Sequence, residues 1–297
     1  MNAKDNALRI MDDTSHIVGQ RDDRIGVILA SKGKLNTVDV EQVLRLQRAR
    51  GFRFGEAALR LGLITEEDLR CAVARQHGLP NLLYDSESVS RELIVDHEPF
   101  HPRAEELRAL RTQLLIRWSK MHIKRRMLAV VSPNPGEGRS YLAANLAVVF
   151  SQLGERTILI DADLRAPRQH RIFNIQNQVG LSTVLSGRAD RSAVVSVSEA
   201  GALSLLAAGV CPPNPQELLL CAAFPALLDE LATMSDVIIF DTPPAKSYAD
   251  AQGLAFHAGS ALVLARKDHT CFADMTSVIR KLGDTGAQIA GTVFNAF

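Results

Sequence analysis

Residues 127–141 read MLAVVSPNPGEGRSY, an apolar run that leads into a short glycine-containing segment. Gly136 and Gly138 let the backbone approach an anion closely, and a helix that begins here would direct its positive N-terminus at that anion. Ser140 adds a hydroxyl suited to a magnesium ion. This stretch therefore predicts a strand, a phosphate-binding loop and a helix, in that order.

Two further apolar runs end in acidic residues. ILIDADLR (158–165) delivers Asp161 and Asp163, and VIIFDTPP (237–244) delivers Asp241. Open α/β sheets bind their ligands at the carboxyl ends of the strands, so we expect these carboxylates beside the phosphate loop. The three segments in this order predict that the chain binds a nucleoside triphosphate with magnesium.

The loop departs at two positions from the usual pattern G-x-x-x-x-G-K-[ST]. Pro133 stands at the first glycine position and Arg139 at the lysine position. Arginine keeps the positive charge but spreads it over a planar group, so it is not an equivalent phosphate ligand. A loop that has lost nucleotide binding is the alternative, and the retained acidic and hydroxyl positions argue against it.

The composition is typical of a globular protein without a strong overall charge. Of 297 residues, 46% are hydrophobic and 23% are charged, and the formal net charge is +1, so we expect no nucleic acid partner. The four cysteines show no metal-ligand spacing and are typical of reduced thiols in the cytoplasm. The N-terminus lacks the apolar core of a signal peptide, and the longest apolar run (218–228) is too short for a membrane span. Recruitment to the inner membrane would therefore need a partner.

From Met127 onward, apolar strands alternate with helices, which predicts an α/β fold: a P-loop NTPase-type parallel sheet with helices on both faces. A small, mainly helical domain precedes it. Expected strands are 127–132, 157–162, 236–241, 261–266 and 289–294, and expected helices cover 103–119 and 140–154. The predicted organisation is a flexible tail (1–23), a helical repeat domain (24–80), a linker (81–102) and the nucleotide-binding domain (103–297).

The helical region contains an internal repeat with an offset of 29 residues. Arg24-Ile25-Gly26 corresponds to Arg53-Phe54-Gly55, and Gln47 corresponds to Gln76. Each unit reads as a short helix, a glycine turn and a second helix, with Thr37 and Thr65 expected as helix N-caps. Two such units would pack their apolar faces on each other.

Residues 100–297 resemble the bacterial tyrosine kinases of capsule and exopolysaccharide synthesis, close to the soluble chain-length-determinant type. The resemblance rests on PGEGRS, ILIDADLR followed by PRQHRIF, PPNPQELL (212–219), VIIFDTPP and GTVFN near the C-terminus. It implies ATP and Mg²⁺ as cofactors. It also implies a membrane chain-length-determinant protein (a polysaccharide co-polymerase) as a partner, and self-assembly into oligomers.

The resemblance further implies roles for individual residues. The catalytic residues would be Asp161, Asp163 and Asp241, and the magnesium ligands Ser140, Asp163 and Asp241. The nucleotide-binding residues would be Pro135, Gly136, Glu137, Gly138, Arg139, Ser140, Tyr141 and Asn295. The spacing Glu105-x-x-Arg108-x-x-Arg111 resembles the subunit-contact motif of the family, and an ordinary solvated helix face is the alternative.

Kinases of this family typically end in a tyrosine cluster that neighbouring subunits phosphorylate. This sequence contains three tyrosines, Tyr84, Tyr141 and Tyr248, and no such cluster. We expect Tyr141 to be buried at the start of the phosphate-loop helix and Tyr84 to be the accessible acceptor. The sequence therefore predicts ATP binding and hydrolysis, and it lacks the acceptor cluster for autophosphorylation in the usual style.

The repeat resembles the N-terminal domain of type II secretion and pilus-assembly ATPases, some of which bind cyclic di-GMP through two tandem 24-residue motifs. Arg24–Gln47 and Arg53–Gln76 have this length and spacing. Paired arginines suit a ligand with two phosphates, because arginine binds phosphate in bidentate fashion. The implied contacts are Arg24, Gly26, Gln47, Arg53, Gly55 and Gln76. A protein-docking domain is the alternative.

Three functions follow from these features. The leading interpretation is an ATP-dependent tyrosine-kinase-type regulator of exopolysaccharide biosynthesis and chain length. The second is a ParA/MinD-like positioning ATPase without kinase activity, although residues 133–135 lack the early lysine typical of that group. The third is a non-catalytic cyclic-dinucleotide receptor that uses the nucleotide fold as a scaffold.

Overall fold

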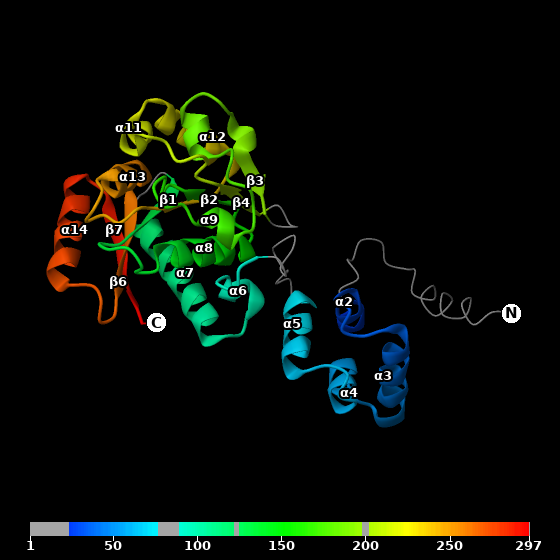
Figure 1. The fold of residues 1–297 in the computed structure, drawn as a ribbon. Coiled ribbons are helices and arrows are strands. Elements are labelled where there is room, and N and C mark those ends of the chain that lie inside the picture. Colours follow the sequence, from blue (N-terminus) through cyan, green and yellow to red (C-terminus); the bar gives the residue numbers. More distant parts are fainter. Residues whose placement is uncertain (1–23, 77–88, 122–124, 198–201, 297) are drawn as a thin grey trace. The chain divides into compact units, whose positions relative to one another are not determined.

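The computed structural model describes residues 24–76, 89–121, 125–197 and 202–296. The chain divides into two compact units, Met1–Pro80 and Asn81–Phe297 (Figure 1). Of the helices in the described part, none combines the length and the hydropathy that a membrane span requires.

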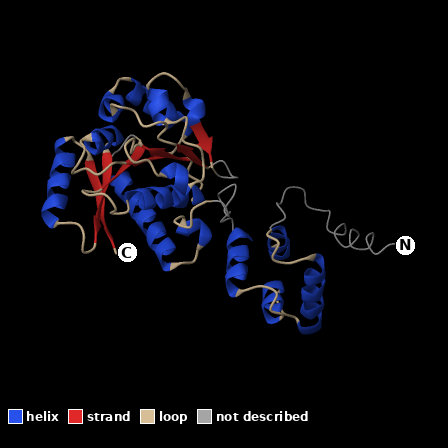
Figure 2. Cartoon of the chain, viewed as in Figure 1, coloured by secondary structure: helices blue, strands red, loops and turns tan. Residues whose placement is uncertain are grey.

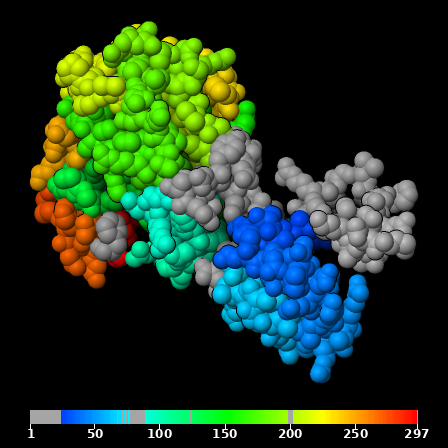
Figure 3. All heavy atoms as spheres, turned by 45° about the vertical axis from the view of Figure 1, so that its right-hand side comes forward, coloured from blue at the N-terminus to red at the C-terminus, as the bar shows by residue number. Residues whose placement is uncertain are grey.

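The first unit is built, in its described part, from α2 (Ile25–Ser31), α3 (Thr37–Arg50), α4 (Phe54–Arg60) and α5 (Glu66–Gln76). Their atoms form one continuous body in the space-filling view (Figure 3). The buried core repeats the 29-residue offset pair by pair: Ile28 with Ala57, Leu29 with Ala58, Leu35 with Ile64, and Val43 with Ala72. The sequence repeat is therefore a structural repeat, in which equivalent positions of the two halves supply the same core.

The second helix of each half also begins with the same hydrogen-bonded cap. The Asn36 side chain accepts from the amide of Asp39, whose carboxylate accepts from the amide of Asn36 (2.9 Å each). Thr65 and Asp68 make the equivalent pair of bonds (3.1 and 2.9 Å). The N-cap of α3 is thus Asn36, and Thr37 is its first helical residue; asparagine caps helices at least as well as threonine.

The second unit is a sheet with helices on both faces (Figure 2). Its strands are β1 (Arg126–Val131), β2 (Thr157–Asp161), β3 (Val194–Ser196), β4 (Leu203–Leu206), β5 (Val237–Asp241), β6 (Ser260–Arg266) and β7 (Gln288–Asn295). Its helices are α6 (Ile94–His97), α7 (Pro102–Lys120), α8 (Arg139–Gln152), α9 (Gln169–Ile172), α10 (Leu181–Leu185), α11 (Pro215–Leu220), α12 (Ala223–Met234), α13 (Asp250–Ala258) and α14 (Phe272–Asp284), with a 3-10 helix at Arg191–Ala193. The strand order is β3-β4-β2-β5-β1-β6-β7, and only the β3–β4 pairing is antiparallel within the described residues. The predicted α/β class is confirmed.

The apolar run of β1 contributes side chains to the cores on both faces of the sheet. Leu128 and Val130 lie in the core that contains α7 and α8, whereas Met127, Ala129 and Val131 lie in the core that contains α12 and α13. Side chains alternate along a strand, so a strand covered on both faces must be apolar throughout. This double coverage explains why the sequence shows a continuous apolar run and no alternation.

The five strands expected from sequence match β1, β2, β5, β6 and β7 within one residue at each end. Strands β3 and β4 were not predicted. Strand β4 has the sequence LSLL, and a run of four residues carries too little periodicity to distinguish a buried strand from a helix.

Part of the expected linker (81–102) belongs to the folded second unit. Over residues 89–102, which the structure describes, Leu93 and Val95 are fully buried in the core beside α8. The Asn145 side chain in α8 donates to the Glu92 carbonyl (2.8 Å) and accepts from the Val95 amide (3.4 Å). The linker prediction is wrong for this segment, because α6 has only four residues and is stabilised by tertiary contacts that local patterning does not report.

Candidate nucleotide site

The predicted phosphate loop connects β1 to α8 at the carboxyl edge of the sheet. Gly136 and Gly138 adopt left-handed φ values of +74° and +102°, which residues with a Cβ rarely adopt. Gly138 is the residue from which α8 starts, and among the described residues no side chain caps this end. The amides of the first turn therefore remain available to an anion.

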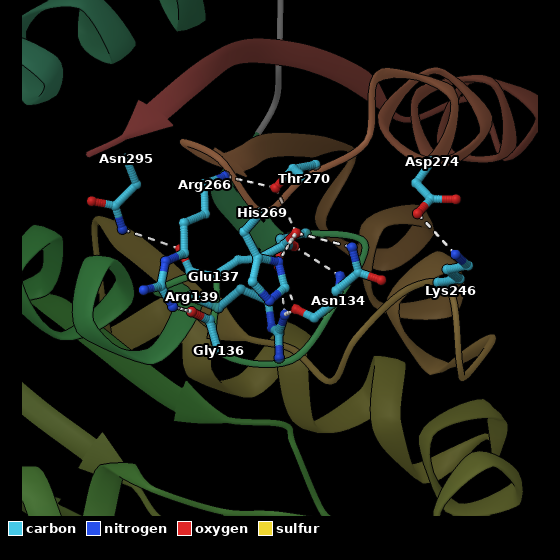
Figure 4. Close-up of polar contacts among 11 residues, drawn as sticks. Asn134, Gly136, Glu137, Arg139, Lys246, Arg266, His269, Thr270, Asp274 and Asn295 are labelled. Atoms are coloured by element: carbon cyan, nitrogen blue, oxygen red, sulfur yellow. Dashed lines mark hydrogen bonds and ion pairs between the residues drawn. The ribbon is translucent and has the colours of Figure 1, made fainter. Parts of the chain in front are cut away.

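Three residues late in the sequence hold this loop (Figure 4). Arg266 donates to the carbonyl of Gly136 (2.9 Å), and Asn295 donates to the carbonyl of Glu137 (3.1 Å). Thr270 donates to the carboxylate of Glu137 (2.5 Å). We call Arg266, Thr270 and Asn295 the loop anchors. They lie at or just after the ends of β6 and β7, so the loop conformation depends on strands formed much later in the chain.

Glu137 is fully buried at the centre of these contacts. Its carboxylate also accepts from the amide and the side chain of Asn134 (2.7 and 3.0 Å). Burial acts to raise the pKa of Glu137, but the hydrogen bonds from Thr270 and Asn134 outweigh it and lower the pKa below its ordinary value. The Glu137 side chain is thus a stable anion that holds the loop together, which leaves its backbone for the nucleotide contact predicted from sequence.

Arg139 points into the protein between the ends of β1 and β5. Its guanidinium donates to the carbonyls of Thr242 (2.8 Å) and Asn134 (2.6 Å) and to the hydroxyl of Ser132. Burial lowers the pKa of Arg139, and the nearby Asp241 carboxylate opposes that effect. Arginine in place of lysine therefore binds the start of the loop to the segment that follows β5. To contact a phosphate directly, its guanidinium would have to exchange some of these partners.

Asp161 and Asp241 are neighbours across β2 and β5 and are both fully buried. Burial, followed by the charge of Asp241, raises the pKa of Asp161 well above its ordinary value. Burial raises the pKa of Asp241 to about 6. One oxygen of each carboxylate, Oδ1, has no hydrogen-bond partner among the described residues. Such unpartnered buried oxygens are costly unless a cation or a proton occupies the site.

The remaining predicted metal ligands lie at the same edge. The Ser140 hydroxyl acts to lower the pKa of Asp241, and Asp163 is nearly buried. Oδ1 of Asp163 accepts from the amides of Arg165 (3.2 Å) and Ala166 (2.9 Å). Among the described residues no group of three His, Cys, Asp or Glu side chains is arranged as a complete metal site. Mg²⁺ is usually bound by one or two carboxylates plus nucleotide phosphates, so this oxygen-rich set fits it.

Gln169 is a site residue that the sequence did not reveal. Its side-chain nitrogen donates to Oδ2 of Asp241 (2.8 Å) and to the Ser140 carbonyl (3.0 Å), and its backbone amide donates to Oδ2 of Asp161 (2.9 Å). It therefore orients both carboxylates and the start of α8. The segment PRQHRIF contributed to the family resemblance, but nothing in it distinguishes this fully buried glutamine from a surface one.

A cavity of about 920 Å³ opens beside the phosphate loop. Gly136, Gly138, Tyr141 and Asn295 line it, together with α7 and the end of β7. These four predicted nucleotide-binding residues are thus brought together. The three aspartates do not line the cavity: Asp161 and Asp241 are the last residues of β2 and β5, and Asp163 lies two residues beyond β2.

The expected subunit-contact residues on α7 are engaged within their own unit. Arg111 donates to the carbonyl of Val149 near the end of α8 (2.7 Å), and burial lowers its pKa. Arg108 donates to the carbonyl of Pro99 (2.7 Å) and pairs with Glu105. Arg108 and Arg111 are half-buried, whereas Glu105 is exposed, so the alternative of an ordinary solvated helix face does not fit the two arginines; the subunit-contact role stays a prediction.

The expected cyclic di-GMP residues occupy equivalent places in the two halves of the first unit. Arg24 and Arg53 are the exposed residues that precede α2 and α4, and Gln47 and Gln76 lie near the ends of α3 and α5. The two glycines have a different role from the one expected. A Cβ on Gly26 would lie 3.0 Å from the Phe54 ring, and one on Gly55 would lie 2.2 Å from Leu69. Both glycines therefore permit close side-chain packing inside the unit, which explains them without a ligand.

Of the two tyrosines that the structure describes, Tyr141 lies at the start of α8 as expected, whereas Tyr248 differs from the expectation. Tyr141 is half-buried with its hydroxyl out of solvent, and burial raises its pKa. Tyr248, which was not considered accessible, is 38% exposed. Tyr84, the expected acceptor, lies outside the described residues.

The second unit is similar to known kinases. The chain is 41% identical over 177 residues to the tyrosine-protein kinase YwqD of Bacillus subtilis, covering 59% of this chain and 74% of that one. The chain belongs to the bacterial tyrosine-protein kinase family. Other members are longer: the putative tyrosine-protein kinase EpsB of Ralstonia solanacearum is 33% identical over 69% of this chain, which spans only 27% of EpsB.

Solved structures agree with this placement. The chimerical protein CapA2B2 has a TM-score of 0.65 and 33% identity, over 78% of this chain and 98% of that one. No protein-family model matches the chain. The relation of the first unit to secretion-ATPase N-terminal domains stays a prediction.

Proposed function

We propose that this kinase binds ATP and Mg²⁺ at the phosphate loop and transfers the γ-phosphate to tyrosine. The observation that carries the proposal is the buried Asp161–Asp241 pair beside the loop, with one unpartnered oxygen on each carboxylate. A binding scaffold has no need of two facing buried carboxylates, whereas phosphoryl transfer needs charge and a proton acceptor at this position. The kinase names of its relatives support the same reading.

Each site residue has a separate role in the proposed reaction. The loop amides bind and orient the phosphates, and Arg139 joins them by exchanging part of its bonds to Ser132, Asn134 and Thr242 for a phosphate. Ser140, Asp163 and Asp241 hold the metal. Magnesium, when bound, spreads positive charge over the transferring phosphate. Asp161 accepts the tyrosine proton, because its raised pKa brings a carboxylate closer to the range in which a general base works well. Gln169 keeps the two carboxylates in place.

Turnover separates this proposal from its alternatives. The purified chain, incubated with ATP and Mg²⁺, is assayed for ADP release and for phosphotyrosine on an added Glu-Tyr copolymer. A tyrosine kinase gives both signals, and Asp161→Asn or Asp241→Asn abolishes both. A positioning ATPase gives ADP without phosphotyrosine. A chain that releases no ADP contradicts the enzymatic proposal and leaves the receptor alternative.

The proposed cellular role follows from the sequence resemblance. The kinase would act in the cytoplasm as a regulator of exopolysaccharide chain length, recruited to the inner membrane by a chain-length-determinant protein and cycling through oligomers. Sedimentation velocity with ATP, ADP or no nucleotide tests the assembly. A sedimentation coefficient that does not change with nucleotide contradicts that part of the proposal.

The first unit is proposed as a cyclic di-GMP site that controls the kinase. The repeat favours a ligand with two-fold symmetry, because Arg24 and Arg53 occupy the same position in the two halves of the unit. Calorimetric titration of the full chain with cyclic di-GMP should give heat. Arg24→Ala and Arg53→Ala should each cost about 1.5–3 kcal/mol of binding, the scale of a hydrogen bond to a charged group. Absence of heat at high micromolar ligand would make the unit a docking domain.

A further inference from the structure

Tyr248 lies on an exposed segment that is bonded directly to the phosphate loop. Residues 246–249, between β5 and α13, are all exposed. Just before them, the amides of Ala245 and Lys246 donate to the carbonyls of Ser132 and Pro133 (3.0 Å each), where the phosphate loop begins. The accessible phenol of Tyr248 therefore lies two residues after Lys246, whose amide is bonded to the start of the loop expected to hold ATP.

Arg165 connects Tyr248 to the predicted metal site. Its guanidinium carbon lies 4.1 Å from the centroid of the Tyr248 ring, a cation–π contact. The same guanidinium donates to buried Asp250 (2.8 Å), which fixes its position. The backbone amide of Arg165 donates to Asp163 (3.2 Å). One residue thus contacts both the phenol ring and a carboxylate of the site.

The other tyrosine in the described part of the chain is a poor acceptor. The Tyr141 hydroxyl is shielded from solvent in the first turn of α8, next to the loop itself. A phenol that must meet the γ-phosphate of ATP needs access for its oxygen. Of Tyr141 and Tyr248, only Tyr248 has the exposure for this role.

We propose that Tyr248 is a phosphorylation site for the kinase's own activity, an inference that rests on the proposed tyrosine-kinase function. The Tyr248 oxygen attacks the γ-phosphorus of ATP bound at a phosphate loop of this protein, and an O–P bond forms. The bond from that phosphorus to the β–γ bridging oxygen breaks, ADP leaves with the electron pair, and the phenolic proton passes to a carboxylate of the site. Arg165 then pairs with the new phosphate, in competition with Asp250.

Phosphopeptide mapping of the full-length chain after incubation with Mg²⁺ and ATP tests the inference. Phosphate is expected on Tyr248, and Tyr248→Phe should lose most of the phosphotyrosine while it retains ADP release and copolymer phosphorylation. Phenylalanine keeps the ring beneath Arg165, so the variant removes the acceptor oxygen alone. Tyr84→Phe is the matched control and should keep the wild-type phosphotyrosine level.

The outcomes distinguish this inference from the proposed function. Copolymer phosphorylation without phosphate on Tyr248 overturns the inference and leaves the kinase proposal standing. A chain that phosphorylates nothing and releases no ADP overturns both. Equal phosphate on Tyr248 in freshly purified Asp241→Asn protein, with or without ATP, would mean that another kinase had modified it and would also overturn self-phosphorylation.

Discussion

Asp241→Asn should stabilise the ligand-free second unit although it abolishes turnover. The fold forces two carboxylates together out of water, and burial raises the pKa of Asp241 from 3.8 to about 6. One pKa unit corresponds to 1.36 kcal/mol, so the charged form of this residue costs the folded state about 3 kcal/mol. Asparagine removes the charge and keeps a carbonyl oxygen for the Gln169 donor. The expected gain at pH 7.5 is about 1–3 kcal/mol, since other contacts change as well.

The stability difference between Asp241→Asn and wild type should depend on pH. The folded pKa of Asp241 lies above the unfolded one, so the folded protein holds more protons between pH 3.8 and about 6. The contribution of this residue to stability is present at low pH and is lost as the pH rises through that window. The free energy of unfolding of Asp241→Asn should therefore exceed that of wild type at pH 7.5 and should be close to it at pH 4.

The assay is urea unfolding followed by the fluorescence of the single tryptophan. Trp118 is buried in the second unit and packs on Phe150, with ring centroids 5.5 Å apart, so its signal reports this unit. Asp163→Asn is the control, because it removes a carboxylate whose Oδ1 accepts two backbone amides, and it should bring no gain. An Asp241→Asn midpoint equal to or below that of wild type at pH 7.5 would refute the reasoning.

Three further predictions concern the loop and α7. Thr270→Val should weaken ATP binding about tenfold, the low end for a lost hydrogen bond to a charged group, whereas Thr270→Ser should bind normally; equal affinities would remove Thr270 from the anchors. Arg139→Ala should bind ATP more weakly than Arg139→Lys, as measured by calorimetry, and wild-type affinity in the alanine variant would exclude a phosphate contact. Arg111→Ala should lower the free energy of unfolding by about 1–3 kcal/mol, because it leaves the Val149 carbonyl without its hydrogen-bond donor. Arg117→Ala, at an exposed position of the same helix, should not lower it. Similar urea midpoints for the two variants would contradict a stabilising role of Arg111.

Strands β1, β2, β5 and β6 were predictable from sequence because they are covered on both faces. Complete burial leaves continuous apolar runs, and a polar residue at the end of each run identifies the ligand edge. The internal repeat was predictable for a related reason: each half needs the same core positions, so Leu29 and Ala58 recur at a fixed offset. Asp161 and Asp241 fall opposite each other because their runs end in register.

Contacts between distant segments were not predictable. Gln169 and Thr270 act through partners that the fold brings to them, and neither belongs to a spacing pattern. The helical spacing on α7 located Arg111 correctly on the helix, but periodicity does not say whether a neighbouring element covers that face. Here the end of α8 does, and its Val149 carbonyl accepts the arginine.

The central claim is that the loop and the buried aspartates transfer phosphate from ATP to tyrosine. The most direct measurement is phosphotyrosine formed from γ-labelled ATP by the purified full-length chain, with Asp241→Asn in parallel. The account predicts ATP-dependent, magnesium-dependent label on tyrosine in the wild type and none in the variant. Label that is absent from the wild type, or equal in the two proteins, would contradict it.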